Sequence, residues 1–255
     1  MNKLVILVLA VLTSYVGYSS VTNTKSMNTM INEGIEIVKK DYKLEPLDIG
    51  EFKKVLIYKV LPFNSKVYSI DGLGILPVMT LNVGVMDIFT FNINSYDKDL
   101  PQLTIDYINT LNKRKLYVEV YDLMINKNDQ KYKDFLKKIE EINAKNSNLV
   151  DFTIKASWHD EYLSGMIKKS GKPANDPQLL SIFKDVIQAY VDYAKEAPEL
   201  SEDNKNKKYD LIKGFSDTLA EKGGVAVNNF KKALGLEKTK EFLGSVLYGY
   251  LHIKE

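Results

Sequence analysis

LPQLTIDYI, at residues 100–108, has the residue pattern of a β-strand. Successive side chains of a strand point to opposite faces, so alternate positions are expected to share a face. One apolar face would be made of Leu103, Ile105 and Tyr107. The other face would carry Thr104, Asp106 and Ile108. The carboxylate of Asp106 would then lie between Thr104 and Ile108, inside one of the most strand-like parts of the chain.

The segments on either side of this stretch share its β-rich composition. Short runs of β-branched and aromatic residues are separated by Asn-Ser, Asp-Gly and Asn-Val-Gly turn signals. These runs are FKKVLIYKVL (52–61), KVYSI (66–70), GILPVMTLNV (74–83), MDIFTFNI (86–93) and KLYVEVYDLM (115–124). Strands that follow one another through such short connections favour an antiparallel sheet.

Helical periodicity flanks the β-rich block on both sides. Before it, MNTMINEGIEIVKKDY (27–42) predicts an amphipathic helix. After it, the helical segments are 129–146, 177–197, 206–222, 228–235 and 239–251. No linker is long enough to divide two domains. The sequence therefore predicts a single α+β domain over residues 27–255, a three-layer α/β/α sandwich with a central antiparallel sheet.

The N-terminus has the pattern of a targeting leader. Lys3 precedes an apolar run at 4–12, and small and polar residues follow. This predicts a signal peptide or leader over residues 1–20 that directs the chain into the secretory or export pathway, with no stable membrane span once the leader is removed. A two-part leader into a plastid-type organelle is one alternative, and a start at Met27 or Met30 is another.

Composition excludes several kinds of chemistry. The 35 basic and 33 acidic residues give a net charge of +2, which does not support a nucleic-acid binder. The absence of cysteine excludes disulfides, zinc–thiolate sites, iron–sulfur ligation and thiol catalysis. The two histidines, His159 and His252, are too far apart in sequence to suggest a metal site. An enzyme with this composition must use carboxylates, hydroxyls, lysines or a bound cofactor.

Asp106 is the first candidate for chemistry. It is either an edge-strand carboxylate that faces water or a proton donor in the wall of a pocket. Its neighbours Thr104 and Ile108 suit a pocket wall. Burial in such a wall would raise the pKa of an Asp above its usual ~3.9, as an acid that works near neutrality needs.

Each of the other candidates could have a purely structural role instead of a role in chemistry. Asp122 closes the next predicted strand and could be a turn or cap residue, and Glu119, between two tyrosines, is more typical of hydrogen-bonded structure than of catalysis. In WHDEYLSGMIKK (158–169), the acidic neighbours of His159 favour a solvated surface turn over a base. KGG at 222–224 is either a helix-breaking loop or a backbone nest for an anion.

Four of these segments follow one another in an order that resembles a known family. They are DLPQLTIDYI (99–108), VEVYDLM (118–124), WHDEYLSGMIKK (158–169) and KKALGLEKTKEFLGSVLYG (231–249). Together they resemble the ferredoxin-dependent bilin reductases and their relatives, the red chlorophyll catabolite reductases. The resemblance covers most of residues 27–252. Each motif is weak evidence alone, and the resemblance depends on all four motifs occurring in the same order as in the family.

The resemblance implies roles for named residues. Asp106 falls where the family places the acidic proton donor to its tetrapyrrole, and Lys168 or Lys169 falls near a basic residue that pairs with a propionate. The implied substrate-binding set is Thr90, Asp122, Trp158, Ser164, Lys168, Lys169, Gly223 and Gly224. Thr90 stands where some bilin reductases have a histidine. Gly223 and Gly224 replace an Asn-Asp pair and are closer to the chlorophyll-catabolite branch.

The function that the resemblance implies is reduction of a linear tetrapyrrole, either a bilin such as biliverdin or a chlorophyll catabolite. It would proceed by proton-coupled single-electron transfers, with no bound metal or flavin and with reduced ferredoxin as the external donor. One alternative is a non-catalytic, exported or organellar tetrapyrrole-binding protein that has lost the redox cycle. Another is an unrelated secreted α+β protein.

Overall fold

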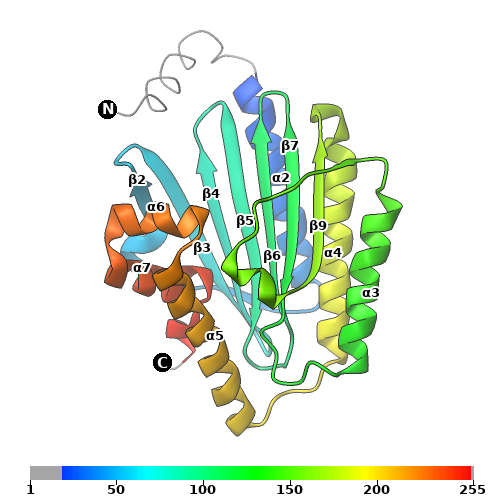
Figure 1. The fold of residues 1–255 in the computed structure, drawn as a ribbon, viewed down its shortest axis with the longest axis vertical. Helices are drawn as coiled ribbons and strands as arrows, with labels where there is room; N and C mark the ends of the chain where they lie inside the picture. Colours follow the sequence, from blue (N-terminus) through cyan, green and yellow to red (C-terminus); the bar gives the residue numbers. More distant parts are fainter. Residues whose placement is uncertain (1–18, 254–255) are drawn as a thin grey trace.

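The structure, a computed structural model, describes residues 19–253. Within these residues nine strands form one sheet, and every pairing is antiparallel (Figure 1). The strands are β1 (Leu44–Pro46), β2 (Lys54–Ile57), β3 (Leu61–Ile70), β4 (Gly74–Asn82), β5 (Met86–Ser95), β6 (Gln102–Thr110), β7 (Arg114–Tyr121), β8 (Val150–Asp151) and β9 (Leu163–Gly171). Their order in the sheet is β1-β3-β4-β5-β6-β7-β9-β8, and β2 also pairs with β3.

Short hairpins make β3 to β7 neighbours in sequence order, which confirms the predicted antiparallel sheet. The turn between β3 and β4 places Gly72 at a φ of 67°, in the left-handed region that glycine adopts without strain. The strand β9 was not expected, because most of its residues lie in the segment 158–169, for which the sequence suggested a surface turn. Its residues LSGMIKKSG are polar and glycine-rich, and within it Ile167 is the only large apolar side chain that is buried.

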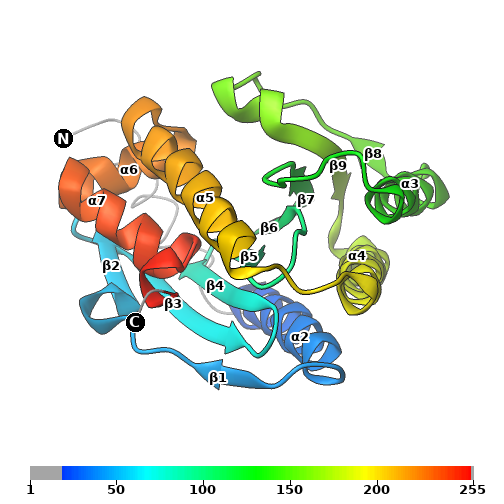
Figure 2. The same cartoon turned by 90° about the horizontal axis from the view of Figure 1, so that it is seen from below.

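Helices cover both faces of the sheet (Figure 2). On one side lie α2 (Ser19–Lys39), α3 (Gln130–Lys145) and α4 (Asp176–Glu196). On the other side lie α5 (Glu202–Lys222), α6 (Val225–Leu234) and α7 (Leu236–Phe242). Short helical turns occupy Gly50–Lys53, Trp158–Tyr162, Pro173–Asn175, Leu243–Leu247 and Tyr250–His252. The predicted three-layer α+β sandwich is therefore confirmed.

The two helical layers bury two separate apolar cores. The first core packs the sheet against α2, α3 and α4, and it contains Leu103, Ile105 and Tyr107 of β6, all 0% exposed. The second core packs the opposite side of the sheet against α5, α6 and α7. Thr104, Asp106 and Ile108 turn away from the first core and are only half-buried. The alternation predicted for residues 100–108 is thus present.

The predicted leader lies almost wholly outside the described residues, which begin at Ser19. The first helix, α2, starts there and so extends before Met27, where the domain was predicted to begin. Within the described part of the chain, no helix combines the length and the apolar character that a membrane span requires.

Candidate functional site

A row of polar side chains crosses four adjacent strands on the sheet face that is turned away from the first core. Asp106 of β6 is paired directly with Thr90 of β5 and with Tyr117 of β7, and Tyr117 is paired with Lys168 of β9. Paired residues of an antiparallel sheet project on the same side, with their Cβ atoms about 5 Å apart. All four side chains are half-buried. The structure thus brings together Thr90, Asp106 and Lys168, which are 78 residues apart in sequence at the extremes (168 − 90).

Asp106 has an environment suited to holding a proton near neutrality. The Thr90 hydroxyl donates a hydrogen bond of 2.5 Å to Oδ1 of Asp106. Burial raises the pKa of Asp106 to about 6, although the bond from Thr90 stabilises the charged form and opposes the rise. A carboxyl group with this pKa exists in both protonation states close to neutral pH, as a general acid must.

Glu119 is a second carboxylate on this face, one that the sequence did not single out as functional. It is paired with Thr104, so it lies diagonally from Asp106 across the β6–β7 pairing. The residue is 5% exposed. Burial and the nearby charge of Asp106 raise the pKa of Glu119 to about 7, whereas the hydroxyls of Tyr117 and Tyr121 and the cation of Lys168 oppose the rise.

The signal for Glu119 was present in the alternation Tyr-Val-Glu-Val-Tyr at 117–121. That pattern places the carboxylate on the tyrosine face of its strand, but it does not say which residues of the neighbouring strand lie opposite. The strand register supplies that information, and it puts Glu119 on the face of Asp106.

Several further polar groups are buried along the same face. The side-chain nitrogen and oxygen of Asn92, Oδ1 of Asn94, Oε1 of Gln102 and Oε1 of Glu119 have no hydrogen-bond partner within the described residues. Asn92 is paired with Thr104, and Nδ2 of Asn94 donates to the carbonyl of Leu247, in the helical turn that follows α7. Buried polar groups usually have partners, so this concentration suits a face that binds a polar ligand or ordered water.

An aromatic cluster lies beside these polar groups. Phe215 of α5 packs against Tyr162, with ring centroids 5.0 Å apart, and against Tyr121 at 5.5 Å. It also contacts Trp158 at 5.8 Å and Tyr248 at 6.0 Å. Phe215, Tyr121 and Tyr248 are buried in this cluster, whereas Trp158 and Tyr162 are half-buried.

Trp158 and the KGG turn meet in space. The indole Nε1 of Trp158 donates a hydrogen bond of 2.8 Å to the carbonyl of Gly223. Lys222 lies over the indole ring, 4.9 Å from its centroid. Gly223 ends α5 at a φ of 78°, and Gly224 precedes the first residue of α6. Of the two alternatives for KGG, the structure shows the helix break between α5 and α6, and substrate binding by Gly223 and Gly224 stays a prediction.

His159 lies in the short helical turn Trp158–Tyr162, where its neighbours Asp160 and Glu161 are exposed, as the surface-turn alternative expected. Its side chain is 20% exposed, because the ring packs against Tyr121. Nδ1 of His159 lies 3.2 Å from the hydroxyl of Tyr121. Burial lowers the pKa of His159, and the charge of Asp160 opposes that change.

Three of the predicted site residues lie apart from the Asp106 row. Lys169 is paired with Leu116 of the first core, is 2% exposed, and forms an ion pair of 2.7 Å with Asp151. Asp122 follows β7 and pairs with Lys127 at 3.1 Å. Ser164 is exposed at the start of β9, beside the hydroxyl of Tyr132 in α3. Of the two adjacent lysines, Lys168 alone shares the face of Asp106.

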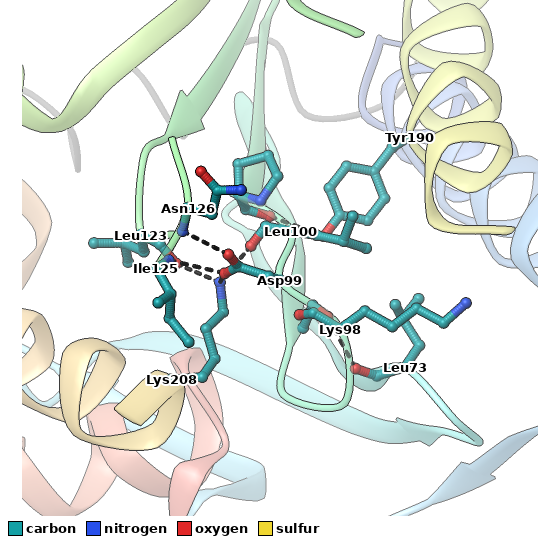
Figure 3. A network of polar contacts seen from close by, with 11 residues as sticks. Leu73, Lys98, Asp99, Leu100, Leu123, Ile125, Asn126, Tyr190 and Lys208 are labelled. Carbon is teal, nitrogen blue, oxygen red and sulfur yellow. Dashed lines mark hydrogen bonds and ion pairs between the residues drawn. The ribbon is translucent and has the colours of Figure 1, made fainter. Parts of the chain in front are cut away.

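The Asp-Leu-Pro turn before β6 is held by a buried network (Figure 3). The carboxylate of Asp99 accepts hydrogen bonds from the backbone of Ile125 at 2.9 Å and of Asn126 at 2.8 Å. Lys208 of α5 is 1% exposed, lies 3.4 Å from Asp99, and donates to the carbonyls of Leu100 and Leu123. Burial lowers the pKa of Lys208 to about 8. The network fixes the start of the strand that carries Asp106.

Metal binding has no candidate cluster within residues 19–253, where no three His, Asp or Glu side chains converge in a way that could hold an ion. The described site itself holds two carboxyl groups, their hydroxyl neighbours, a lysine and an aromatic cluster.

Comparison with known proteins gives a structural likeness only. No family model and no curated protein matches the sequence. A crystal structure of phytochromobilin synthase from tomato, in complex with biliverdin, is similar with a TM-score of 0.71. The match covers 88% of this chain and 83% of that chain, at 14% sequence identity. At this identity the likeness shows a common fold, and that fold agrees with the bilin-reductase resemblance of the four sequence motifs.

Proposed function

We propose that this protein reduces a linear tetrapyrrole with single electrons from reduced ferredoxin. One observation carries the proposal: a half-buried aspartate, Asp106, whose pKa burial raises to about 6, on a fold shared with a phytochromobilin synthase that binds biliverdin. The match between the environment of Asp106 and the needs of a proton donor supports a catalytic role over simple storage of the pigment.

The sheet face and the aromatic cluster suit the chemistry of the substrate. A linear tetrapyrrole is flat and conjugated, with polar ring edges and two carboxylate side chains. Its rings would contact Trp158 and Tyr162, the half-buried aromatics that pack on Phe215, and the unpaired amide of Asn92 and the unpaired Oε1 of Gln102 would face its polar edges. Each added electron makes the pigment more basic, and Asp106 would then pass it a proton. Reduction of one double bond consumes two electrons and two protons in this way. The conjugated pigment can itself hold the unpaired electron, so the proposal needs no bound metal or flavin.

Lys168 would pair with one propionate of the pigment. It lies on the face of Asp106, whereas Lys169 lies on the other face and is neutralised by Asp151. Lys168→Ala is expected to weaken pigment binding about tenfold, as the loss of one charged hydrogen bond does. Lys169→Ala is the matched control and should leave the affinity within about twofold. Absorbance titration measures both, and equal effects of the two variants would contradict the assignment.

Asp106→Asn tests the proton-donor role. The amide keeps the shape of the side chain but cannot supply a proton, so turnover should fall about 100-fold or more while pigment affinity stays within several-fold. The measurement is anaerobic reduction of bound biliverdin by a ferredoxin-reducing system, followed by absorbance. Asp134→Asn, which neutralises an exposed carboxylate on α3, is the control and should react like wild type.

The same assay separates the proposal from its alternative. A blue-shifted product band with the wild-type protein supports a reductase. Binding of biliverdin and of a chlorophyll catabolite without any spectral change under reduction would overturn it in favour of a non-catalytic tetrapyrrole-binding protein. No binding of either pigment would refute both functions.

A further inference from the structure

We infer that Glu119 and Tyr121 form a proton path that leads from His159, near the protein surface, to Asp106. The inference rests on the proposed function, because it supplies the protons that Asp106 would deliver to the pigment. Proton donation by Asp106 alone does not involve Glu119, Tyr121 or His159, and the inference gives these three residues a role.

The inner end of the path is set by the register of β6 and β7. Tyr117, Glu119 and Tyr121 are alternate residues of β7 and project from the same face. Asp106 is directly opposite Tyr117, so Glu119 is its diagonal neighbour. Diagonal Cβ atoms in a sheet are about 7 Å apart, a gap that the two carboxyl side chains can span directly or through the Tyr117 hydroxyl.

The outer end of the path is at His159. The Tyr121 hydroxyl lies 3.2 Å from Nδ1 of His159, within hydrogen-bond distance. The His159 side chain is 20% exposed and lies 3.9 Å from the partly exposed carboxylate of Asp160. It therefore has contact with solvent on one side and with the buried tyrosine on the other. Imidazole can accept a proton at one nitrogen and release one at the other, which suits a shuttle.

Glu119 connects the two ends, because the hydroxyls of Tyr117 and Tyr121 both hydrogen-bond its side chain, while one of its carboxylate oxygens is left without a partner. The residue is 5% exposed, and its Oε1 makes no hydrogen bond to any described residue. A buried carboxylate that only stabilised the fold would be expected to have an ion-pair or hydrogen-bond partner at each oxygen. The titratable groups that face Glu119 are Asp106, Tyr117, Tyr121, Lys168 and Tyr248.

The proton balance closes without charged intermediates on the tyrosines. When Asp106 has lost its proton to the pigment, neutral Glu119 gives its proton to the Asp106 carboxylate. The Tyr121 hydroxyl then donates to the Glu119 carboxylate while it takes the Nδ1 proton of His159, and in the same step His159 takes a proton from solvent at Nε2, so that the imidazole stays neutral. Tyr121 receives one proton as it releases one, so no phenolate forms. This agrees with burial, which raises the pKa of Tyr121 far above its ordinary value.

The first test uses the ligand-free protein and does not depend on turnover. Carbon-13 labelling of the Glu side-chain carboxyls allows the titration of Glu119 to be followed by NMR and assigned with Glu119→Gln. In wild type, Glu119 should titrate well above the exposed glutamates. In Asp106→Asn the midpoint should move to lower pH by half a unit or more, because a neighbouring negative charge is gone. An unchanged midpoint in Asp106→Asn would overturn the connection between the two carboxyls.

The second test measures pigment reduction against pH. Glu119→Gln and Tyr121→Phe should each slow reduction about tenfold or more and change the shape of the pH profile, with pigment affinity unaltered. Glu119→Asp, which keeps a titratable group, should recover part of the rate. Tyr193→Phe removes a buried hydroxyl from α4 on the other side of the sheet and should match wild type.

The two tests distinguish failure of the path from failure of the function. If wild type reduces the pigment and Glu119→Gln does so at the same rate at every pH, the proton path is wrong and the reductase stands. If wild type reduces no tetrapyrrole, the proposed function is wrong and no proton path to a pigment remains. The NMR titration would then still decide whether Glu119 and Asp106 are coupled.

Discussion

At the scale of single residues, the two carboxyls of the sheet face impose a cost on the fold. Asp106 and Glu119 are both partly or wholly buried, and neither is paired with a cation in an ion pair within 4 Å among the described residues. Burial raises the pKa of each above its ordinary value. A folded protein that holds such groups binds protons more tightly than its unfolded chain, so its stability depends on pH.

The pH dependence has a definite sign. The pKa of Glu119 is about 7 in the folded state, against 4.5 for an ordinary Glu, so both states are protonated below this window. As pH rises from about 4.5 to 7, the unfolded chain releases its proton first, and stability is lost. Glu119→Gln, which mimics the neutral acid, should therefore be more stable than wild type at pH 8, by up to about 3 kcal/mol, and the difference should shrink to about 1 kcal/mol at pH 5.

Urea unfolding at pH 5, 6, 7 and 8 measures this difference. Glu140→Gln, which neutralises an exposed carboxylate of α3, serves as the control and should show a constant difference across the series. A Glu119→Gln variant that is less stable than wild type at pH 8 would mean that the charged carboxylate has a stabilising partner, against the buried and unpaired Oε1 described above.

At the scale of secondary-structure elements, turns between helices decide whether segments far apart in sequence can meet. α5 ends at Lys222, and Gly223, at a positive φ, breaks the helix before α6 begins at Val225. This turn presents the Gly223 carbonyl to the indole of Trp158 on the segment before β9. The contact joins the turn between α5 and α6 to the segment that leads into β9.

The two adjacent glycines of this turn should respond differently to substitution. A Cβ on Gly223 would lie 2.2 Å from Oδ1 of Asn228, and the φ of 78° is unfavourable for any other residue. Gly223→Ala should therefore destabilise the fold by about 1–3 kcal/mol. Gly224 has an extended φ of −167°, and the nearest atom to an added Cβ is 3.8 Å away. Gly224→Ala should cost less than about 0.5 kcal/mol.

Thermal or urea denaturation of both variants checks this contrast. The intrinsic fluorescence of Trp158, the only tryptophan of the chain, reports on the same turn. Equal stabilities for the two alanine variants would show that the turn relaxes freely and does not constrain Trp158.

At the scale of the whole molecule, buried charged residues join the layers at two places. Arg114, the only arginine, is 1% exposed and donates through Nε to Asp176 at 2.8 Å, which connects β7 to the start of α4. Lys208 connects α5 to the Asp99 turn and to Leu123, just after β7 (Figure 3). The first contact lies on the side of the first core, and the second lies on the side of the second core.

Loss of Lys208 should therefore loosen the second layer as a whole. Lys208→Ala leaves Asp99 and the carbonyls of Leu100 and Leu123 without their buried donor, which should cost about 3–5 kcal/mol. Lys207→Ala removes the exposed neighbouring lysine and should change stability by less than about 0.5 kcal/mol. Chemical denaturation measures both, and hydrogen exchange should show increased opening of α5 in Lys208→Ala. A similar, small effect for the two lysines would refute this role.

Much of the fold followed from local patterns. The alternation in residues 100–108 predicted the two faces of β6, and helical periodicity predicted α3, α4 and α5 close to their observed bounds. The strand β9 was not predicted, because its polar residues lack the apolar alternation of the other strands. The leader, the ferredoxin donor and the site assignments stay predictions.

The sequence by itself determined the period of each element, the place of most turns and the face on which Asp106 lies, because these depend on residues a few positions apart. Only the tertiary structure decided which strands are neighbours, and hence that Glu119 faces Asp106 and that Lys168 rather than Lys169 shares their face. It also decided the burial that raises both carboxyl pKa values. Strand register and burial arise from contacts between distant segments, and a local pattern of residues carries no information about those partners.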